Sequence, residues 1–480
     1  TDSQLSTMWG GLYKAIGQCN FFIDAISKST LSDKYKKNAS GQAKFVRGLC
    51  YYNLATYFGG VPLRIQPTTA EDLNIPKSSQ MDVFKQVEKD WLDAANDLLP
   101  KQDPSAKVGM GTKYAAYAYL TKLYFMMASQ ENTSSSPYWA KAKAAGDEVI
   151  LNGGYSLEPK FANLFKNYVA SSPESIFQLN FTTTSTLVGN RTSWVFSPAN
   201  STTGISFARV RSSKSFYDFF KGTYLDDPRL KETFITTWKQ IKTNNANVFS
   251  YPYTSKTVAG VIVVADSINY ATLSDPTNPK LTEIPATVKT LYTAKVGDHQ
   301  GWPCYKKFMD VAATAQNSNR NIILYRYADF LLIMAEVENE LGNTTKSVSY
   351  ANLVLSRARA SKTVPSVFPK NWSATSTQAE LRSKIYYERL FELAGECEMY
   401  IDVRRRGADY LKLVVDRHNN HEITKTFVAN AVTVNNTTNF RDRLLPNTTD
   451  LIKKNLLFPI PQTEFNSNTS FKPSDQNYGY

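Results

Sequence analysis

Apolar side chains recur at three- and four-residue spacings in several segments of the first third of the chain. In residues 8–27, for example, Leu12, Ile16 and Cys19 follow one another at offsets of 4 and 3. Because an α-helix has 3.6 residues per turn, these offsets place the side chains on one face. The helices predicted in this way are residues 8–27, 43–58, 81–99, 112–129 and 138–150.

The pattern changes after residue 154. From 155 to 316, Thr, Ser, Asn, Pro and Tyr dominate and the helical spacing is largely lost. Runs such as residues 175–181 and 258–264 have the composition expected of short strands, and the rest is expected to form long loops. Helical spacing resumes in residues 323–341, 347–360 and 379–407.

These elements predict a mainly α fold, in which tetratricopeptide-like helix pairs are stacked as a scaffold beside a large irregular loop-rich region carrying short strands. Long irregular insertions on a rigid scaffold commonly carry binding sites. We expect one domain over 1–480, made of N-terminal helical repeats (1–154), a loop-rich ligand-binding region (155–316), C-terminal helical repeats (317–410) and an irregular tail (411–480).

The chain is rich in aromatic residues and contains more basic than acidic residues. Aromatic residues make up 13% of the chain, and the formal net charge is +13. Tyr and Trp suit both helix packing and wet binding surfaces, and positive charge suits acidic ligands, nucleic acids or anionic membranes. The Lys and Arg residues are scattered, and their one dense cluster, residues 404–406, lies among acidic residues. The sequence therefore predicts no nucleic-acid partner.

Cysteine and histidine give no indication of metal or redox chemistry. The four cysteines lie far apart with no C-x-x-C pair, and we predict that all are buried thiols. His418 and His421 are three residues apart, but the two asparagines between them favour a turn. No cofactor-binding sequence motif occurs. The sequence also has no run of 18 apolar residues, the length needed to span a bilayer.

Short motifs occur in a fixed order along the chain. In the first predicted helices they are Trp9-x-x-x-Tyr13 with Ile16 and Asn20, then residues 41–48 followed by 58–63. Later motifs are residues 153–157, 164–165, 173–177, 227–229, 306–308, 326–336, 388–402, 457–461 and 476–477. This series resembles the SusD/RagB family over nearly the whole chain, and the Arg-Tyr-Ala-Asp of residues 326–329 is the strongest single match.

The resemblance implies an outer-membrane lipoprotein of Bacteroidetes that faces the cell exterior. Such a protein captures oligosaccharides or polysaccharides and delivers them to a SusC-like TonB-dependent transporter, without enzymatic activity or a cofactor. The sequence begins without Met or an apolar leader, which is expected after removal of a signal peptide. The lipidated N-terminal cysteine of the family is not among these residues, so a lipid anchor in the outer membrane is implied by the resemblance alone.

A row of carboxylates in the predicted helix 379–407 has two interpretations. Glu388, Glu392 and Glu396 share one helix face, as the acid pair of a helical glycosidase would. We favour a structural salt-bridge network and predict no enzyme, because arginines near in sequence and helical phase can neutralise the row. These arginines are Arg389, Arg404 and Arg405. Met399 replaces an arginine usual in the family, so we expect the local ion network to be rearranged.

Sugar binding needs flat apolar rings for the C–H faces of the sugar and polar side chains for its hydroxyl groups. Aromatic residues of the loop-rich region are the candidates, and for each ring the alternative is a core position beneath a loop. The predicted ligand-binding residues are Trp302, Trp194, Tyr251, Tyr253, Trp238 and Arg191.

Two other functions stay open at this point. Some members of the resembling family bind peptides, so a RagB-like peptide-uptake protein is the first alternative. An intracellular tetratricopeptide scaffold is the second, although it would not need so much loop rich in Tyr, Thr and Asn.

Overall fold

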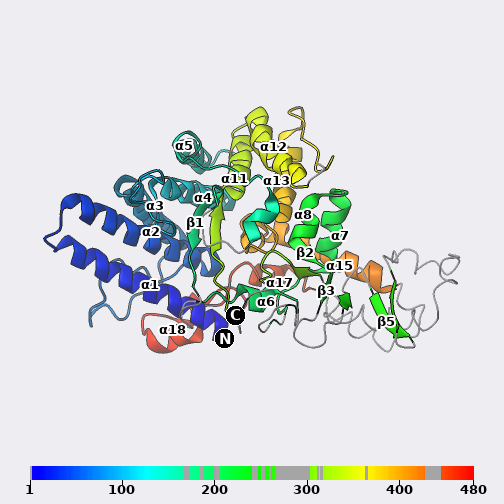
Figure 1. The fold of residues 1–480 in the computed structure, drawn as a ribbon. Coiled ribbons are helices and arrows are strands. Elements are labelled where there is room, and N and C mark those ends of the chain that lie inside the picture. Colours follow the sequence, from blue (N-terminus) through cyan, green and yellow to red (C-terminus); the bar gives the residue numbers. More distant parts are fainter. Residues whose placement is uncertain are drawn as a thin grey trace.

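The fold is mainly helical, as predicted, with stacked helix pairs beside a loop-rich region (Figure 1). The computed structural model describes residues 3–166, 172–182, 189–198, 201, 206, 208–239, 247–249, 254–258, 261–265, 303–310, 313, 317–362, 366–427 and 445–480.

The N-terminal helices form a stack in which each packs against the next along the chain. They are α1 (Ser3–Ser27), α2 (Asp33–Phe58), α3 (Gln80–Asp97), α4 (Lys113–Glu131) and α5 (Pro137–Asn152). Ser79 and Thr112 cap α3 and α4, because each hydroxyl accepts a hydrogen bond from a backbone N–H group of the first turn. The helices predicted from hydrophobic spacing are confirmed here.

A second helical group continues the stack. It consists of α11 (Tyr327–Glu340), α12 (Thr344–Ala360), α13 (Gln378–Glu392) and the short α14 (Glu398–Asp402). Helix α11 packs against α12 and α13, and also against α5 and α4 of the first group. The two groups therefore form one scaffold, although more than 150 residues separate them in sequence.

The helix predicted over 323–341 begins later than expected. Strand β8 (Ile322–Arg326) occupies its first turn and pairs antiparallel with β1 (Ser175–Leu179), with Ser175 opposite Arg326 and Leu179 opposite Ile322. The β-branched Ile322 and Ile323 favour an extended backbone, and the pairing with β1 overrides the helical spacing. This two-stranded sheet connects the loop-rich region to α11.

The long helix predicted over 379–407 is interrupted. Helix α13 ends at Glu392, and α14 begins at Glu398. Gly395 and Cys397 between them have φ values of 83° and 70°, in the left-handed region that ends a helix. A Cβ on Gly395 would lie 2.8 Å from the ring of Tyr305, so the chain also approaches a neighbour too closely for any side chain.

Several helices lie where the sequence predicted loops or coil. The loop-rich region contains α6 (Thr192–Phe196), α7 (Lys214–Thr223) and α8 (Pro228–Thr233), and the tail contains α15 (Ala408–Phe427), α17 (Thr449–Lys454) and α18 (Gln462–Ser467). The turn predicted at His418 was wrong, because α15 continues through it. Asn419 instead bonds the backbone of Leu445 with its side-chain amide.

The short strands of the loop-rich region form separate two-stranded pairs. Strand β2 (Phe234–Ile235) pairs with β7 (Cys304–Tyr305), β3 (Thr237–Lys239) pairs with β4 (Asn247–Phe249), and β5 (Thr254–Val258) pairs with β6 (Val261–Ala265). All three pairs are antiparallel.

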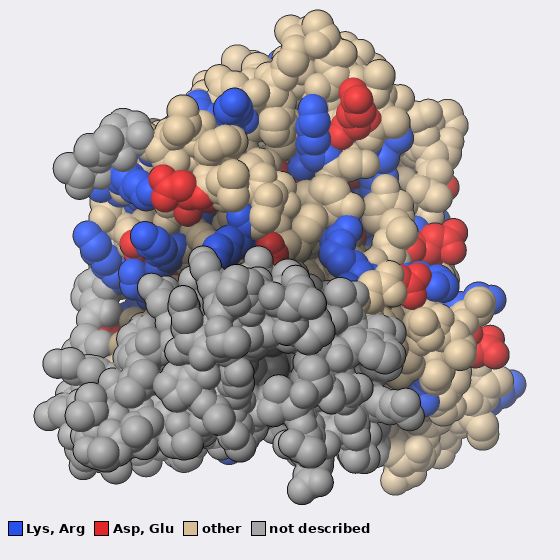
Figure 2. Space-filling model, turned by 90° about the vertical axis from the view of Figure 1, so that its right-hand side faces the viewer, with Lys and Arg blue, Asp and Glu red and all other residues tan. Residues whose placement is uncertain are grey.

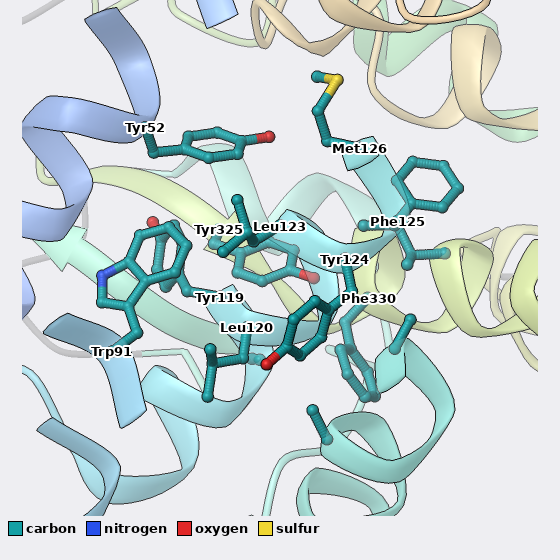
Figure 3. Packing of buried hydrophobic residues seen from close by; sticks show 14 of the residues in the cluster. Tyr52, Trp91, Tyr119, Leu120, Leu123, Tyr124, Phe125, Met126, Tyr325 and Phe330 are labelled. Atoms are coloured by element: carbon teal, nitrogen blue, oxygen red, sulfur yellow. The ribbon is translucent and has the colours of Figure 1, made fainter. Parts of the chain in front are cut away.

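Helix α4 lies at the centre of the main core and is buried on nearly every side. Figure 3 shows its Tyr119 between Trp91 of α3 and Tyr325 of β8, with ring centroids 5.1 Å and 5.0 Å away. A second apolar cluster joins α7, α13 and α15 around Phe220 and Phe391, and Met399 packs against it. Thus the methionine found in place of the family's arginine contributes apolar contact.

The C-terminal segment returns to the first helices. Asn477 donates hydrogen bonds to the carbonyl oxygens of Phe58 and Phe458, and Trp9 donates its indole N–H to Glu464 across 3.1 Å. The terminal motifs noted in the sequence therefore close the end of the chain onto α1 and α2.

Three of the cysteines are buried as predicted, but the prediction was wrong for Cys397, which is exposed in the break between α13 and α14. None of the described helices carries an apolar stretch long enough to cross a bilayer.

Two glycines in neighbouring helices test the packing of this core. A Cβ at Gly48 of α2 would lie 2.6 Å from the indole nitrogen of buried Trp91, whereas one at Gly17 of α1 would meet nothing within 4 Å. We expect Gly48→Ala to destabilise the protein by about 1–3 kcal/mol through overpacking. Gly17→Ala should stabilise it by roughly 0.5–1 kcal/mol through helix propensity. The urea concentrations at which the two variants and the unaltered protein are half unfolded show whether each substitution lowers or raises stability. Equal midpoints would contradict this account of the core.

Candidate functional site

A buried ion network lies where the loop-rich region meets the second helical group. The carboxylate of Glu392, with no exposed surface, accepts hydrogen bonds from Arg229 at 2.8 Å, from Arg326 at 2.6 Å and also from Arg357. Burial alone would raise the pKa of this carboxyl group, but the three guanidinium groups outweigh burial and hold the pKa well below its usual range.

The same network connects segments that are distant in sequence. Glu174, next to β1, bonds Arg326 of β8 at 2.9 Å and Arg357 of α12 at 2.6 Å. Asp227 and Arg229, at the start of α8, pair with each other at 2.7 Å, and Arg229 also pairs with Glu388 of α13. Each of these side chains is fully or almost fully buried. Charge pairing therefore joins β1, β8, α8, α12 and α13.

Lys307 connects the segment after β7 to the network. Its ammonium group bonds the Glu396 carboxylate at 2.7 Å and the backbone oxygen of Glu392 at 2.9 Å. Burial lowers the pKa of Lys307 to about 8, and the attraction of Glu396 limits that decrease. Arg326 also binds Glu396, at 2.7 Å.

The partners predicted for the glutamate row were wrong, although the predicted type of structure, a salt-bridge network, is present. Arg389 pairs with Asp329 at 2.6 Å and with Asp402 at 2.9 Å. Arg405 pairs with Glu336 and Asp402, and Arg404 lies over the ring of Tyr400. The break between α13 and α14 removes Arg404 and Arg405 from the phase that a continuous helix would have given them, whereas Arg389 lies within α13 and faces Asp329 and Asp402.

These carboxylates have the surroundings of structural groups. Glu388 and Glu392 have no exposed surface, so a substrate could not reach them without opening the fold. Burial raises the pKa of Glu388 to about 7, against the opposing effect of Arg229. Over the ranges that the structure describes, no group of three or more His, Cys, Asp or Glu side chains is placed to hold a metal ion.

Two of the predicted ligand-binding residues belong to one short segment: Trp194 lies in α6, and Arg191 directly precedes it. Asn190, two residues before the helix, exchanges backbone hydrogen bonds of 2.9 Å with Ser318, and its side-chain amide donates to the carbonyl oxygen of Arg320. Its side-chain oxygen accepts from the N–H of Thr192 at 2.7 Å. Asn190 is buried, so it fixes the position of α6 and is not a surface contact.

Trp194 of α6 is partly exposed and lies against the side chain of Arg209. The guanidinium carbon of Arg209 lies 4.6 Å from the centre of the Trp194 ring, within cation–π range, and the Arg209 N–H bonds the carbonyl of Val195 at 2.7 Å. The side chain of Arg191, the residue just before α6, is exposed. A flat ring beside guanidinium donors is one arrangement that can contact both the face and the hydroxyl groups of a sugar.

The other predicted ring within the described residues has a different environment. Trp238 of β3 is 8% exposed and packs in a small cluster with Ala208 and Cys304, which favours the core alternative for this ring. Trp302, Tyr251 and Tyr253 lie outside the described residues.

The charged surface agrees with the scattered basic residues of the sequence. Figure 2 shows separate groups of Lys and Arg on one face, with acidic side chains among them. Several partly exposed lysines are in fact paired with acids, such as Lys412 with Asp416 and Lys306 with Glu232 at 2.8 Å.

Comparison with known proteins assigns the chain to a family. A family model described as "SusD family" matches residues 126–480, and one described as "Starch-binding associating with outer membrane" matches residues 1–125. The chain belongs to the SusD/RagB family of cell-surface proteins associated with the outer membrane, a family that includes glycan-binding members.

Individual relatives agree in sequence and in fold. SusD-like protein P2 of Formosa agariphila is 28% identical over 415 residues, which are 84% of this chain and 72% of that protein. A SusD homologue from Bacteroides thetaiotaomicron has the same fold, with a TM-score of 0.75, 19% identity, and coverage of 100% of this chain and 86% of that one. A laminarin-binding SusD-like protein matches with a TM-score of 0.64, 20% identity, and coverage of 99% and 86%.

Sequence reasoning missed the arginines and the lysine that neutralise the glutamate row. Arg229, Arg326 and Lys307 each belong to a motif that was recognised, but motif order gives no information on which charges meet in space. Arg357 belongs to none of the quoted motifs. The sequence did carry one signal of this network, because several of these charged residues have apolar neighbours in the chain. A charged side chain buried among apolar residues needs an oppositely charged partner.

The pairing of Glu336 with arginines predicts a dependence of stability on pH. Burial would raise the pKa of Glu336, but Arg405 and Arg406 outweigh it and lower the pKa to about 2. A carboxyl group whose pKa is lower in the folded state stabilises the fold above its unfolded pKa of about 4.3, and this contribution is lost as the pH falls.

We therefore expect the difference in free energy of unfolding between the unaltered protein and Glu336→Gln to narrow by roughly 2 kcal/mol from pH 6 to pH 3. Denaturant titrations at several pH values measure it. Glu131→Gln, at an exposed position, is the matched control and should show little change. A difference for Glu336→Gln that is constant with pH would contradict the ion pairing.

Proposed function

We propose that this protein binds oligosaccharides or polysaccharides without altering them, through a surface formed by its loop-rich region, residues 155–316. Membership of the SusD/RagB family supports glycan binding, and the laminarin-binding relative is one protein of the same fold with a carbohydrate ligand. The finer assignment to particular residues rests on the surroundings of α6.

The observation that carries the residue assignment is the group formed by Trp194, Arg209 and Arg191. It combines a partly exposed ring on a short helix that buried hydrogen bonds hold in place with two guanidinium groups, one from Arg209 against the ring and one from Arg191 directly before the helix. A ring that does not have to be ordered on binding loses little entropy when a sugar stacks on it. Trp302, Tyr251, Tyr253 and, with less surface, Trp238 complete the proposed set of ligand-binding residues.

We propose that the protein does not hydrolyse the glycans it binds. The glutamates that a glycosidase would use are buried and bound to arginines, so they support the fold. We propose further that the bound glycan passes to a SusC-like TonB-dependent transporter and that a lipid on the N-terminal side of α1 anchors the protein to the outer membrane. These two steps rest on family membership alone.

The first test is to measure binding of laminarin and a panel of other oligosaccharides by calorimetry, with the unaltered protein and Trp194→Ala. Loss of one stacking ring should weaken binding about tenfold, which corresponds to about 1.4 kcal/mol. Tyr35→Ala is the matched control, because this ring is 57% exposed but lies on α2, and its loss should leave binding unchanged.

The same samples are analysed for sugar breakdown over time. We expect no new reducing ends. Steady release of products that Glu392→Gln abolishes would contradict non-catalytic binding, and binding of peptides with no binding of any sugar would favour the RagB-like alternative. Equal binding by Trp194→Ala and the unaltered protein would exclude α6 from the site.

A further inference from the structure

A cavity of about 260 Å³ lies in the helical scaffold, outside the loop-rich region. It is a partly open cavity bordered by the C-terminal ends of α2 and α4, the start of α3, the turn after α14 and residues 456–457. Side chains that line it include Arg404, Tyr400, Gln80, Gln130, Met126 and Leu456.

Arg404 is the only one of three successive arginines without a carboxylate partner within the described part of the chain. Its Nε donates to the carbonyl oxygen of Asn455 at 2.7 Å, and one Nη1 hydrogen points to the carbonyl oxygen of Tyr400 at 3.2 Å. Its guanidinium carbon lies 3.7 Å from the centre of the Tyr400 ring. No carboxylate among the described residues accepts a hydrogen bond from either Nη group.

The two arginines that follow Arg404 in the same turn are both neutralised by carboxylates. Arg405 pairs with Glu336 at 2.7 Å and with Asp402 at 3.0 Å, while Arg406 pairs with Glu336 and with Glu340 at 3.3 Å. Arg404 has only neutral oxygens as acceptors, and burial lowers its pKa. A partly buried cation without a counter-charge is unfavourable, so an anion in the cavity would be stabilised.

The remaining walls suit a small polar ring. Gln130 donates its side-chain N–H to Oε1 of Gln80 at 3.4 Å, and Gln80 donates its own to the carbonyl oxygen of Ala55 at 2.7 Å. The side-chain oxygen of Gln130 and the second N–H of each amide can bond hydroxyl groups. Met126 and Leu456 supply apolar surface. The volume lies just below the range of about 300–1,000 Å³ typical for drug-sized ligands, so one sugar ring is a suitable size.

We propose that this cavity binds a single acidic sugar residue, whose carboxylate or sulfate group pairs with the guanidinium group of Arg404. The cavity is separate from the loop-rich region and would recognise charge, whereas the α6 group would recognise the flat face of a sugar. The proposal therefore does not depend on the site proposed around Trp194.

The test measures binding of glucuronate and of its uncharged analogue glucuronamide to the full chain by ligand-observed nuclear magnetic resonance. The unaltered protein should bind glucuronate at least tenfold more tightly than glucuronamide, because a hydrogen bond between charged groups is stronger than one to a neutral amide. Arg404→Met should remove this preference, and Arg404→Lys should keep part of it. Glucose 6-sulfate in a parallel titration distinguishes a sulfate ligand from a carboxylate ligand.

Arg417→Met is the matched control. Arg417 also lies over aromatic rings, 4.2 Å from the centre of Phe219 and 4.9 Å from that of Tyr387, but it does not line the cavity. Its loss should leave the preference for glucuronate unchanged. Arg404→Met should also still bind any neutral oligosaccharide that the unaltered protein binds, so failure here is distinguishable from failure of the loop-region site.

Equal binding of glucuronate and glucuronamide by the unaltered protein overturns the proposal, provided that glucose 6-sulfate also binds no better than glucose. A glucuronate preference that persists in Arg404→Met overturns it as well. If Arg404→Met does not fold, the comparison is made with Arg404→Lys, which must show a smaller preference than the unaltered protein.

Discussion

The buried carboxylate of Glu392, held by three arginines, is the interaction on which the arrangement of this protein depends. Removing one charge of such a group from water costs several kcal/mol, so the group is stable only when its partners are complete. Here Arg229, Arg326 and Arg357 arrive from three separate elements. The requirement for complete pairing therefore fixes how α8, β8 and α12 lie against α13.

This arrangement separates the tasks of the two parts of the chain. Stacked helices with an aromatic core supply the rigid frame, and the ion network attaches the ends of the loop-rich region to it. Short segments such as α6 can then present side chains outward from fixed positions. Acidic residues that resemble the machinery of a glycosidase serve as counter-charges, which is consistent with a protein that binds glycans and leaves them intact.

Hydrophobic spacing predicted the long helices correctly because their apolar stripes meet neighbouring helices in the stack. It failed where tertiary contacts decide: Ile322 and Ile323 pair with β1, Gly395 and Cys397 break the helix that the carboxylate row suggested, and α15 continues through Asn419. For the candidate site, the sequence placed Trp194 and Arg191 together but gave no sign of Arg209. Spacing also cannot tell a partly exposed ring from a packed one such as Trp238, because burial depends on distant segments.

The most direct test of the central claim is hydrogen–deuterium exchange of the unaltered protein and of Arg229→Met. If the network attaches the loop-rich region to the scaffold, loss of Arg229 should accelerate exchange in residues 172–182, 227–239 and 322–326, while α1, α2 and α3 keep their protection. Unchanged exchange in those segments, or an equal acceleration over the whole chain, would contradict the claim.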